Sequence, residues 1–198
     1  FYQGISSERW FPSKGMNLKH PCVGFLQGAV IWGKSKEMLT LSQIIKKNPN
    51  ITFYWAGDGP YRERILSVLK KFENFKWLGP LKYPDQVRNF LQEIDVYGLA
   101  SGIDMSPLTL LEAQLMKKPV ISTNVGGIPE LMKDTETGYL VDIGNYVEWN
   151  KKINLILDDQ KTSKRMGELG RKYVVEKFNW EKITEDFLKM VHQKFQLK

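Results

Sequence analysis

Six short apolar runs alternate with longer amphipathic segments along this sequence, an order that few folds accommodate. The runs are rich in β-branched or aromatic residues and end near Gly, Ser or Asn, as buried strands do. They predict strands over residues 22–29, 51–57, 75–79, 95–101, 119–124 and 137–141. Helices are expected over 35–47, 61–72, 83–92, 107–116 and 146–157, then a helical tail over 160–196 that is interrupted at 178–180. The sequence therefore predicts an α/β, Rossmann-like, doubly wound parallel sheet of about six strands with helices on both faces.

The length of 198 residues allows a substantial core, because a chain of this size buries roughly 70% of its unfolded surface. Cys22 is the single cysteine, so no internal disulfide can form and a reducing compartment is the simpler interpretation. No apolar run approaches the ~18 to 20 residues that cross a bilayer, and the first residues lack the pattern of a signal peptide. We therefore expect a soluble, cytoplasmic chain.

The net charge of +7 comes from 29 Lys and Arg against 22 Asp and Glu. The basic residues are mixed with acids in helical stretches such as KKFENFK and KTSKRMGELGRK. This mixture favours solvated helix faces, with a surface for polyanions or membranes as the second interpretation.

In a doubly wound sheet, ligands bind at the carboxyl ends of the strands. Gly57 and Gly59 follow the second predicted strand in the turn GDGP, and Leu81 and Lys82 follow the third. Glycines there can let a ligand approach, or can simply supply the backbone angles of a tight turn before a helix that starts at Pro60. The turn alone leaves both interpretations open.

The stretch after the fourth strand, SGIDMSPLTLLEAQLMKKPVISTNVGGIPE, is more specific. Ser106 is expected to cap a helix whose first residue is Pro107, which leaves the amides of Leu108 and Thr109 free to bind an anion. Asp104 precedes this helix and Glu112 lies in its second turn, with seven residues between the two acids.

Glu112 stands among Leu and Ala residues that are expected to be buried, and a buried carboxylate needs partners. The alternative is an exposed helix residue or one that pairs with a lysine. In GGIPE, Gly126 and Gly127 let a ligand approach the backbone before a short helix; the alternative for Glu130 is that an acid there simply favours the start of that helix.

No metal site is expected. His20 and His192 stand alone in the sequence, and the adjacent acids Asp158 and Asp159 point apart on a helix.

Residues 101–141, SGIDMSPLTLLEAQLMKKPVISTNVGGIPELMKDTETGYLV, resemble the signature of the retaining GT-B-fold glycosyltransferases of family four, the glycosyl transferases group 1. The signature consists of two acids separated by seven residues, Glu-Ala, a Pro-Val-Ile strand and Gly-Gly-x-Pro-Glu. Similar segments elsewhere, QGISSERWFP, WAGDGPYRE, DVYGLAS and FNWEKITEDFL, extend the resemblance over nearly the whole chain.

The resemblance implies the C-terminal, donor-binding half of a GT-B fold. Residues 1–18 would be an interdomain linker, 19–178 the Rossmann-like nucleotide-sugar-binding domain, and 179–198 a C-terminal helix that packs toward an acceptor-binding N-terminal domain with no counterpart here. The donor would be a nucleoside-diphosphate sugar, with no cofactor or metal required and no nucleic acid partner. A glycan, a lipid or another acceptor would bind the missing domain, which would place the full-length protein at the inner face of the membrane. The chain alone would be inactive for transfer.

The resemblance also assigns roles to single residues. Asp104 and Lys34 would be catalytic, with Asp104 facing the donor sugar and Lys34 the diphosphate, while Glu112 would bind the ribose hydroxyls and the backbone of Leu81 and Lys82 the base. The other donor-binding positions would be Ser106, Leu108, Thr109, Gly57, Gly59, Gly126 and Gly127. Two positions depart from the family pattern, because Asp104 replaces the usual Glu and Ala29 replaces an Arg. Lys34 and the amides of Leu108 and Thr109 would then carry most of the leaving-group stabilisation.

Two other functions compete with this one. A GT-B-like nucleotide-sugar epimerase would share these loops, but the His and acids that it uses are not visible here. A module that binds polyanions or membranes would use the net charge and the six Trp residues, and its binding would weaken steeply with salt.

Overall fold

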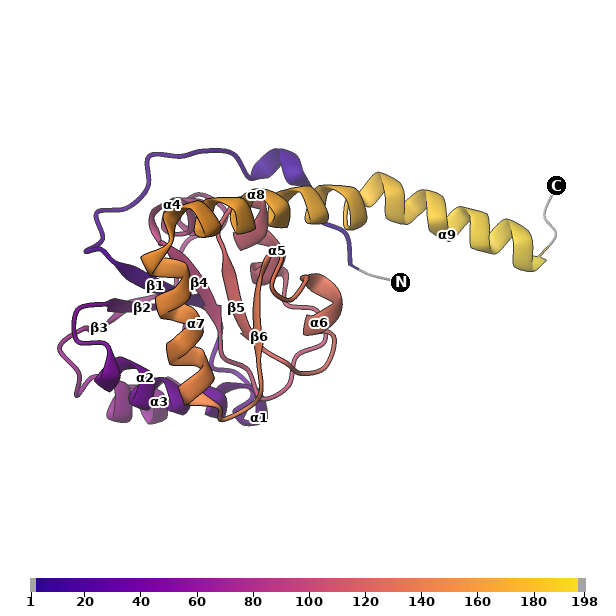
Figure 1. The fold of residues 1–198 in the computed structure, drawn as a ribbon. Coiled ribbons are helices and arrows are strands. Elements are labelled where there is room, and N and C mark those ends of the chain that lie inside the picture. Colours follow the sequence, from indigo (N-terminus) through magenta and orange to yellow (C-terminus); the bar gives the residue numbers. More distant parts are fainter. Residues whose placement is uncertain (1–2, 196–198) are drawn as a thin grey trace.

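The computed structural model describes residues 3–195 and contains one parallel sheet of six strands in the order β3-β2-β1-β4-β5-β6 (Figure 1). The strands are β1 (Cys22–Leu26), β2 (Thr52–Ala56), β3 (Phe75–Gly79), β4 (Val96–Leu99), β5 (Val120–Thr123) and β6 (Gly138–Val141). Phe1, Tyr2 and residues 196–198, which belong to the predicted linker and terminal helix, lie outside the described residues. Every predicted strand is present. Most are shorter than predicted, because residues such as 27–29 leave the ladder to form loops.

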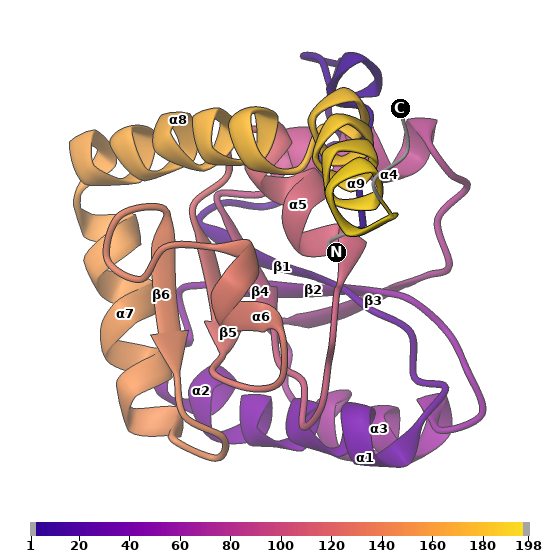
Figure 2. The same ribbon diagram turned by 90° about the vertical axis from the view of Figure 1, so that its right-hand side faces the viewer.

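Helices cover both faces of the sheet, as predicted (Figures 1 and 2). One face packs against the 3-10 helix η2 (Lys36–Thr40), α2 (Leu41–Lys47), α3 (Arg62–Leu69) and α7 (Tyr146–Asp158). The other packs against α4 (Asp85–Glu93), α5 (Leu108–Leu115), α6 (Ile128–Leu131) and α8 (Gln160–Lys177). Alternate strand residues serve the two cores; Phe25, for example, faces α7, and Leu26 faces the opposite layer.

The helix predicted over 35–47 is wrong at its start. The chain already turns at α1 (Trp32–Ser35), continues through η2 and becomes regular only in α2. The Ser35 amide and its hydroxyl both donate to the Ile31 carbonyl at 2.9 Å, which fixes the early turn. These local hydrogen bonds offset the weak helix propensity of Gly33, and they place Lys34 on a short helix beside the sheet edge.

The segment before β1 lies against the domain. A short 3-10 helix, η1 (Ser7–Arg9), is followed by Trp10, which is 1% exposed. The Ile5 amide donates to the Phe178 carbonyl at 2.8 Å, and the Met16 amide donates to Glu93 Oε2 at 3.1 Å. Much of the predicted linker is therefore held by the helices that cover one face of the sheet.

The helical tail breaks where the sequence predicts. Phe178 is buried and ends α8, and the Asn179 side chain accepts the Lys182 amide at 2.8 Å to start α9 (Trp180–Phe195). Helix α9 extends away from the body of the domain (Figure 1) and has no buried residue. Among the described helices, none combines the length and the apolar character needed to cross a bilayer.

Candidate functional site

The loops that follow β1 and β4 meet at one edge of the sheet. These strands are neighbours although β2 and β3 lie between them in the sequence, and this crossover point is where doubly wound sheets bind ligands. The Gln27 side chain donates to the Ala100 carbonyl at 2.9 Å and accepts the Ala100 amide at 3.1 Å. The Gly102 amide donates to the Lys34 carbonyl at 2.9 Å. Four residues predicted from the sequence, Lys34, Asp104, Leu108 and Thr109, therefore lie on or directly after these loops.

Lys34 and Asp104 form an ion pair through Nζ and Oδ2. The Asp104 side chain is 8% exposed, whereas that of Lys34 is 28% exposed. The carboxylate is thus enclosed by protein, and the ammonium group closes it from the solvent side. The structure brings together the two residues predicted to be catalytic, and a ligand at this edge would meet the lysine first.

The start of α5 corrects one prediction. The helix begins at Leu108, and its N-cap is Pro107 in an extended conformation, with no side-chain capping bond. The Ser106 hydroxyl is one position too early to cap the helix. Instead it is buried with no hydrogen-bond partner among the described residues. A buried hydroxyl without a partner is costly, so this oxygen is available to a ligand at the same place.

The amides of Leu108 and Thr109 lie at the positive end of α5, as predicted, and within residues 3–195 neither donates to a protein acceptor. The Tyr97 hydroxyl lies below them, 2.7 Å from Thr109 Oγ1 and 3.3 Å from the Leu26 carbonyl. Burial, and to a smaller extent the Glu112 and Asp104 carboxylates, raise the pKa of Tyr97. Both acids therefore lie within electrostatic reach of the same hydroxyl.

Glu112 is 4% exposed and lies on α5 among buried residues. Burial raises the pKa of its carboxyl from 4.5 to about 7, against the opposing effect of a side-chain interaction with Tyr83. The prediction that Glu112 is buried is confirmed, and its alternative as an exposed helix residue is wrong. A buried carboxylate this poorly compensated is suited to accept hydroxyl donors from a ligand.

Tyr83 links Glu112 to the loop after β3, where Leu81 and Lys82 lie. The Lys82 amide donates to the Gln86 side chain at 2.8 Å, and the Lys82 carbonyl accepts the Gln86 amide at 3.0 Å. The backbone of Lys82 is thus engaged with α4. Among the described residues the Leu81 backbone has no such partner, so a ligand would meet Leu81 first.

Gly57 and Gly59 allow two loops to pack. A side chain at Gly57 would collide with the Gln27 carbonyl, and one at Gly59 would collide with the Ala29 carbonyl. The Gly59 amide is already bonded to the Asp58 side chain at 2.7 Å, and that of Gly57 to the Gly79 carbonyl at 2.9 Å. These contacts favour the interpretation that the glycines of GDGP serve the tight turn and the packing of the loops. They would affect a ligand indirectly, through the loop after β1.

Ala29 is fully buried, and its carbonyl accepts the Tyr61 amide at 3.0 Å. Position 29 therefore belongs to the packing between the loops after β1 and β2, where the resemblance would place an arginine. Because position 29 is alanine, the site has one cation fewer than the family pattern, and Lys34 is the cation in contact with Asp104.

Gly126 and Gly127 hold the loop that carries Asp104. A side chain at Gly126 would collide with the Asp104 carbonyl and one at Gly127 with the Met105 carbonyl, while the Gly127 amide donates to the Asp104 carbonyl at 3.0 Å. The close approach predicted for a ligand is occupied by protein backbone at these two positions. Their effect on Asp104 is therefore one of positioning.

We expect Gly127→Ala to destabilise the fold by about 1 to 3 kcal/mol, because overpacking against a backbone oxygen forces the Asp104 loop to move. Gly33→Ala is the matched control on the same edge, since nothing lies within 4 Å of its added methyl group. The control should stay within about 0.5 kcal/mol of the wild type. Urea unfolding of both variants measures the difference, and equal stabilities would contradict this role of Gly127.

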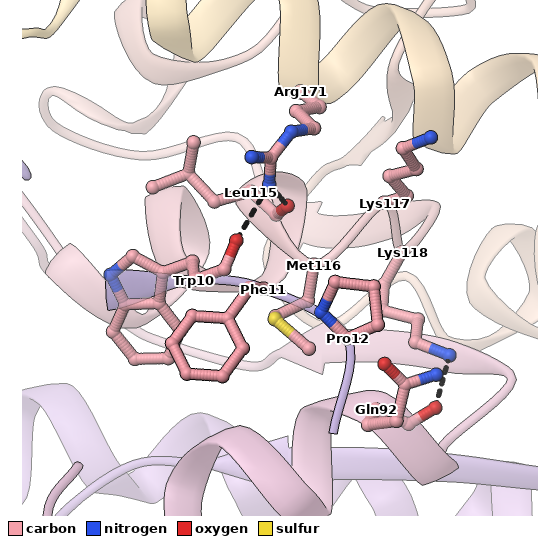
Figure 3. Close-up of a pocket in the computed structure, with 9 residues that line it drawn as sticks. All are labelled: Trp10, Phe11, Pro12, Gln92, Leu115, Met116, Lys117, Lys118 and Arg171. Carbon is pink, nitrogen blue, oxygen red and sulfur yellow. Dashed lines mark hydrogen bonds between the residues drawn. The ribbon is translucent and has the colours of Figure 1, made fainter. Parts of the chain in front are cut away.

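A cavity of about 470 Å³ lies at the opposite edge of the sheet, between the segment before β1 and helices α4, α5 and α8 (Figure 3). Two of its cations, Arg171 and Lys118, bind carbonyl groups of the protein itself. Arg171 donates to the Trp10 carbonyl at 2.8 Å and also to the Leu115 carbonyl, and Lys118 donates to the Gln92 carbonyl at 2.7 Å. These bonds satisfy carbonyls at helix ends, so the positive charges of Arg171 and Lys118 have a structural explanation.

The sequence analysis missed Tyr97, Tyr83 and Gln27. Tyr97 lies inside an apolar strand, although a buried tyrosine hydroxyl usually has a hydrogen-bond partner and could have marked this residue. Gln27 and Tyr83 gave no such signal, because their partners, Ala100 and Glu112, lie far away in the sequence.

Comparison with known proteins identifies the family of this chain. A family model described as glycosyl transferases group 1 matches residues 6–173. N-acetyl-alpha-D-glucosaminyl L-malate synthase of Bacillus anthracis is 34% identical over 132 residues, covering 67% of this chain and 35% of that protein. The lipopolysaccharide core biosynthesis glycosyltransferase LpsE of Rhizobium meliloti is 27% identical over 155 residues, covering 78% and 46%. The chain thus spans half or less of the length of these curated relatives.

Solved structures share the fold. Sucrose-phosphate synthase from Thermosynechococcus elongatus superposes with a TM-score of 0.85 at 22% identity, over 98% of this chain and 52% of that one. Anabaena HepE in complex with UDP-glucose superposes with a TM-score of 0.78 at 17% identity, over 96% and 56%. At these identities the likeness is one of fold.

Proposed function

The chain belongs to the glycosyl transferases group 1 family, and from this membership we propose that it binds the donor of a retaining glycosyltransferase. The donor is a nucleoside-diphosphate sugar, from which a hexosyl residue passes to an acceptor. Residues 19–178 form the binding domain. A separate N-terminal domain binds the glycan, lipid or other acceptor. The match to only half or less of each relative's length is consistent with such a second domain.

One observation carries the proposal: the Lys34–Asp104 pair lies beside the free amides of α5 and the buried Glu112. A nucleoside-diphosphate sugar has three groups that these features match. Its diphosphate is an anion for Lys34 and the α5 amides, its ribose offers hydroxyls to Glu112, and its hexose offers hydroxyls to Asp104.

The chemistry follows from charge. As the glycosidic bond breaks, negative charge develops on the diphosphate, and fixed donors aimed at that charge lower the barrier. Lys34 and the amides of Leu108 and Thr109 are such donors, and they need no metal ion for this role. Because Asp104 already holds the Lys34 ammonium, the lysine is positioned before the donor arrives and bridges carboxylate and phosphate afterwards.

Asp104 has one methylene less than the glutamate common in the family, so its carboxylate reaches about 1.5 Å less far toward the sugar, and a water molecule can fill this distance. The contact between Asp104 and Lys34 gives the shorter side chain a second task, which is to orient the cation. The donor sugar therefore contacts this carboxylate through water.

The base is read by the loop after β3, where the Leu81 backbone is the available partner. HepE has been solved with UDP-glucose, and a related mannosyltransferase of Corynebacterium glutamicum is named as dependent on GDP-mannose. Calorimetric titration of this chain with UDP, GDP and ADP identifies the base, and the tightest ligand is used in the tests below.

The Glu112→Gln variant tests the ribose contact. Each hydrogen bond to a charged group contributes about 1.5 to 3 kcal/mol, so losing the carboxylate should weaken nucleoside-diphosphate binding more than tenfold. The 2′-deoxy ligand, which lacks one of the donors, should be much less sensitive to the change. The four affinities are measured at about pH 8, where the wild-type carboxyl is ionised. If the variant weakened both ligands equally, Glu112 would be excluded from the ribose site.

A further inference from the structure

A cluster of ligand-type side chains lies at the amino-terminal edge of the sheet, opposite the donor site. His20 precedes β1, Cys22 begins it, and Asp95 directly precedes β4. His20 Nδ1 is 2.8 Å from Asp95 Oδ2 and 3.8 Å from Cys22 Sγ. One ligand atom from each of the three residues lies within 4.8 Å of the others. Within residues 3–195 this is the one such group of three or more His, Cys, Asp or Glu side chains.

We propose that His20, Cys22 and Asp95 bind a divalent transition-metal ion of the zinc class. Zinc accepts this mixture of nitrogen, thiolate and carboxylate ligands, at about 2.0 to 2.1 Å from nitrogen and about 2.3 Å from sulfur. In a tetrahedral site these bond lengths separate the nitrogen from the other two ligand atoms by roughly 3.4 to 3.6 Å. The observed separations of 2.8 and 3.8 Å bracket that value, and Cys22 Sγ and a carboxylate oxygen of Asp95 lie within 4.8 Å of each other, so small side-chain movements would form the site.

Glu93 supplies the outer contact that histidine ligands of metals require. Its Oε1 lies 3.0 Å from His20 Nε2, so Nε2 donates its hydrogen to this carboxylate, while Nδ1, which lies 2.8 Å from Asp95 Oδ2, would lose its own hydrogen to bind the metal. The Met16 amide donates to Glu93 Oε2 at 3.1 Å and holds this carboxylate in place. A carboxylate that orients the ring and makes it more basic is the usual companion of a metal-bound imidazole.

The surroundings allow an ion to enter. The His20 side chain is 41% exposed, so a water molecule can reach a fourth ligand position. Burial raises the pKa of the Cys22 thiol to about 12, so the metal must displace a firmly held proton. Lys118, whose Nζ donates to the Gln92 carbonyl at 2.7 Å, adds one positive charge near Asp95 and Cys22. The two negative charges of a metal-bound thiolate and carboxylate outweigh this single positive charge.

A metal here would join the segment before β1 to the connection between α4 and β4. It would fix the direction in which the chain enters the domain, at the edge of the sheet away from Lys34 and Asp104. The proposal therefore stands independently of donor binding.

Cobalt titration tests the site, because a thiolate bound to Co²⁺ gives an intense ligand-to-metal absorption band. The chain is stripped with a chelator and titrated with Co²⁺, then with Zn²⁺ as competitor. Cys22 is the single cysteine, so any such band reports this site. We expect the band to saturate at a single equivalent and to be removed by Zn²⁺. If no band appears with Co²⁺ in excess, the cluster is only a hydrogen-bond network and the proposal fails.

Variants assign the ligands. His20→Ala and Asp95→Asn should each lose the saturable band, while His192→Ala, which removes the other histidine from exposed α9, should retain it. Glu93→Gln should keep the band but weaken metal binding about 10- to 100-fold, as the loss of an outer contact does. Circular dichroism checks that each variant is folded. A band that persists unchanged in folded His20→Ala, or that is lost in His192→Ala, overturns the assignment.

Discussion

Raising the pH from about 5 to about 8 is expected to destabilise the ligand-free chain by about 3 kcal/mol through the single side chain of Glu112. Burial raises the pKa of this carboxyl from 4.5 to about 7 in the folded state. The folded chain therefore holds a proton that the unfolded chain releases between these values. The stability that the neutral form contributes is fully present below pH 4.5 and is lost as the pH rises through about 7.

The Glu112→Gln variant isolates this effect, because glutamine keeps the shape and cannot ionise. Urea unfolding of the wild type and the variant at both pH values gives four free energies. Between the low and the high pH, the free energy of unfolding of the variant should rise by about 3 kcal/mol relative to that of the wild type. Glu130→Gln, at an exposed position near the same edge, serves as the control and should leave the pH dependence unchanged. The same pH dependence in Glu112→Gln as in the wild type would contradict the burial argument.

Lys34→Met should lower the free energy of unfolding by about 2 to 3 kcal/mol and weaken nucleoside-diphosphate binding at least tenfold. The loss of stability arises because Asp104, at 9% exposure, is left as a buried carboxylate without its cation. Because Lys34 is partly exposed, the loss of stability should be smaller than the largest losses measured when one partner of a buried ion pair is removed. The loss of affinity arises because the diphosphate loses its charged donor.

A second substitution separates the two effects. In Lys34→Met/Asp104→Asn no carboxylate remains to be stranded, so much of the lost stability should return, while the affinity for the diphosphate should remain low. Lys164→Met, an exposed lysine on α8, is the control for net charge. Calorimetry with the nucleoside and its diphosphate completes the comparison. If Lys164→Met weakened diphosphate binding as much as Lys34→Met, the general basic surface would explain binding better than the site does.

The sheet could be predicted because its signal is local. Each strand is a short apolar run, and the four central runs are buried on both faces, so no knowledge of the partner strand is needed to recognise them. The burial of Glu112 could be predicted for the same reason, since its sequence neighbours on α5 are apolar.

The details that depend on tertiary contacts could not be predicted. Ser106 matches the residue preference of a helix cap, but the helix begins one residue later than expected and leaves its hydroxyl buried. Gly126 and Gly127 were interpreted as space for a ligand, whereas the space is filled by the carbonyls of Asp104 and Met105. The choice between ligand and protein depends on where a distant loop lies.

His20 shows the same limit in another way. In the sequence it stands apart from other ligand-type residues, and its isolation was an argument for a purely structural role. In the fold it contacts Asp95 and Glu93, which are more than seventy positions away. The spacing of residues along the sequence can therefore indicate a metal site only where the ligands lie close together in the chain. It gives no information about a site whose ligands come together when the sheet forms.

The strand order makes the donor site a late product of folding. β1 first pairs with β2, the next strand along the chain, whereas its other neighbour, β4, must be brought back across β2, β3, four α-helices and η2. The Gln27–Ala100 bonds that join the two site loops span 73 residues. Because closing so long a loop costs entropy before its contacts form, such pairings slow folding and follow local ones. A folding intermediate that contains β1, β2 and β3 alone would hold Lys34 without Asp104. Recovery of nucleotide binding during refolding would therefore report completion of the sheet, after the far-ultraviolet signal of the helices has returned.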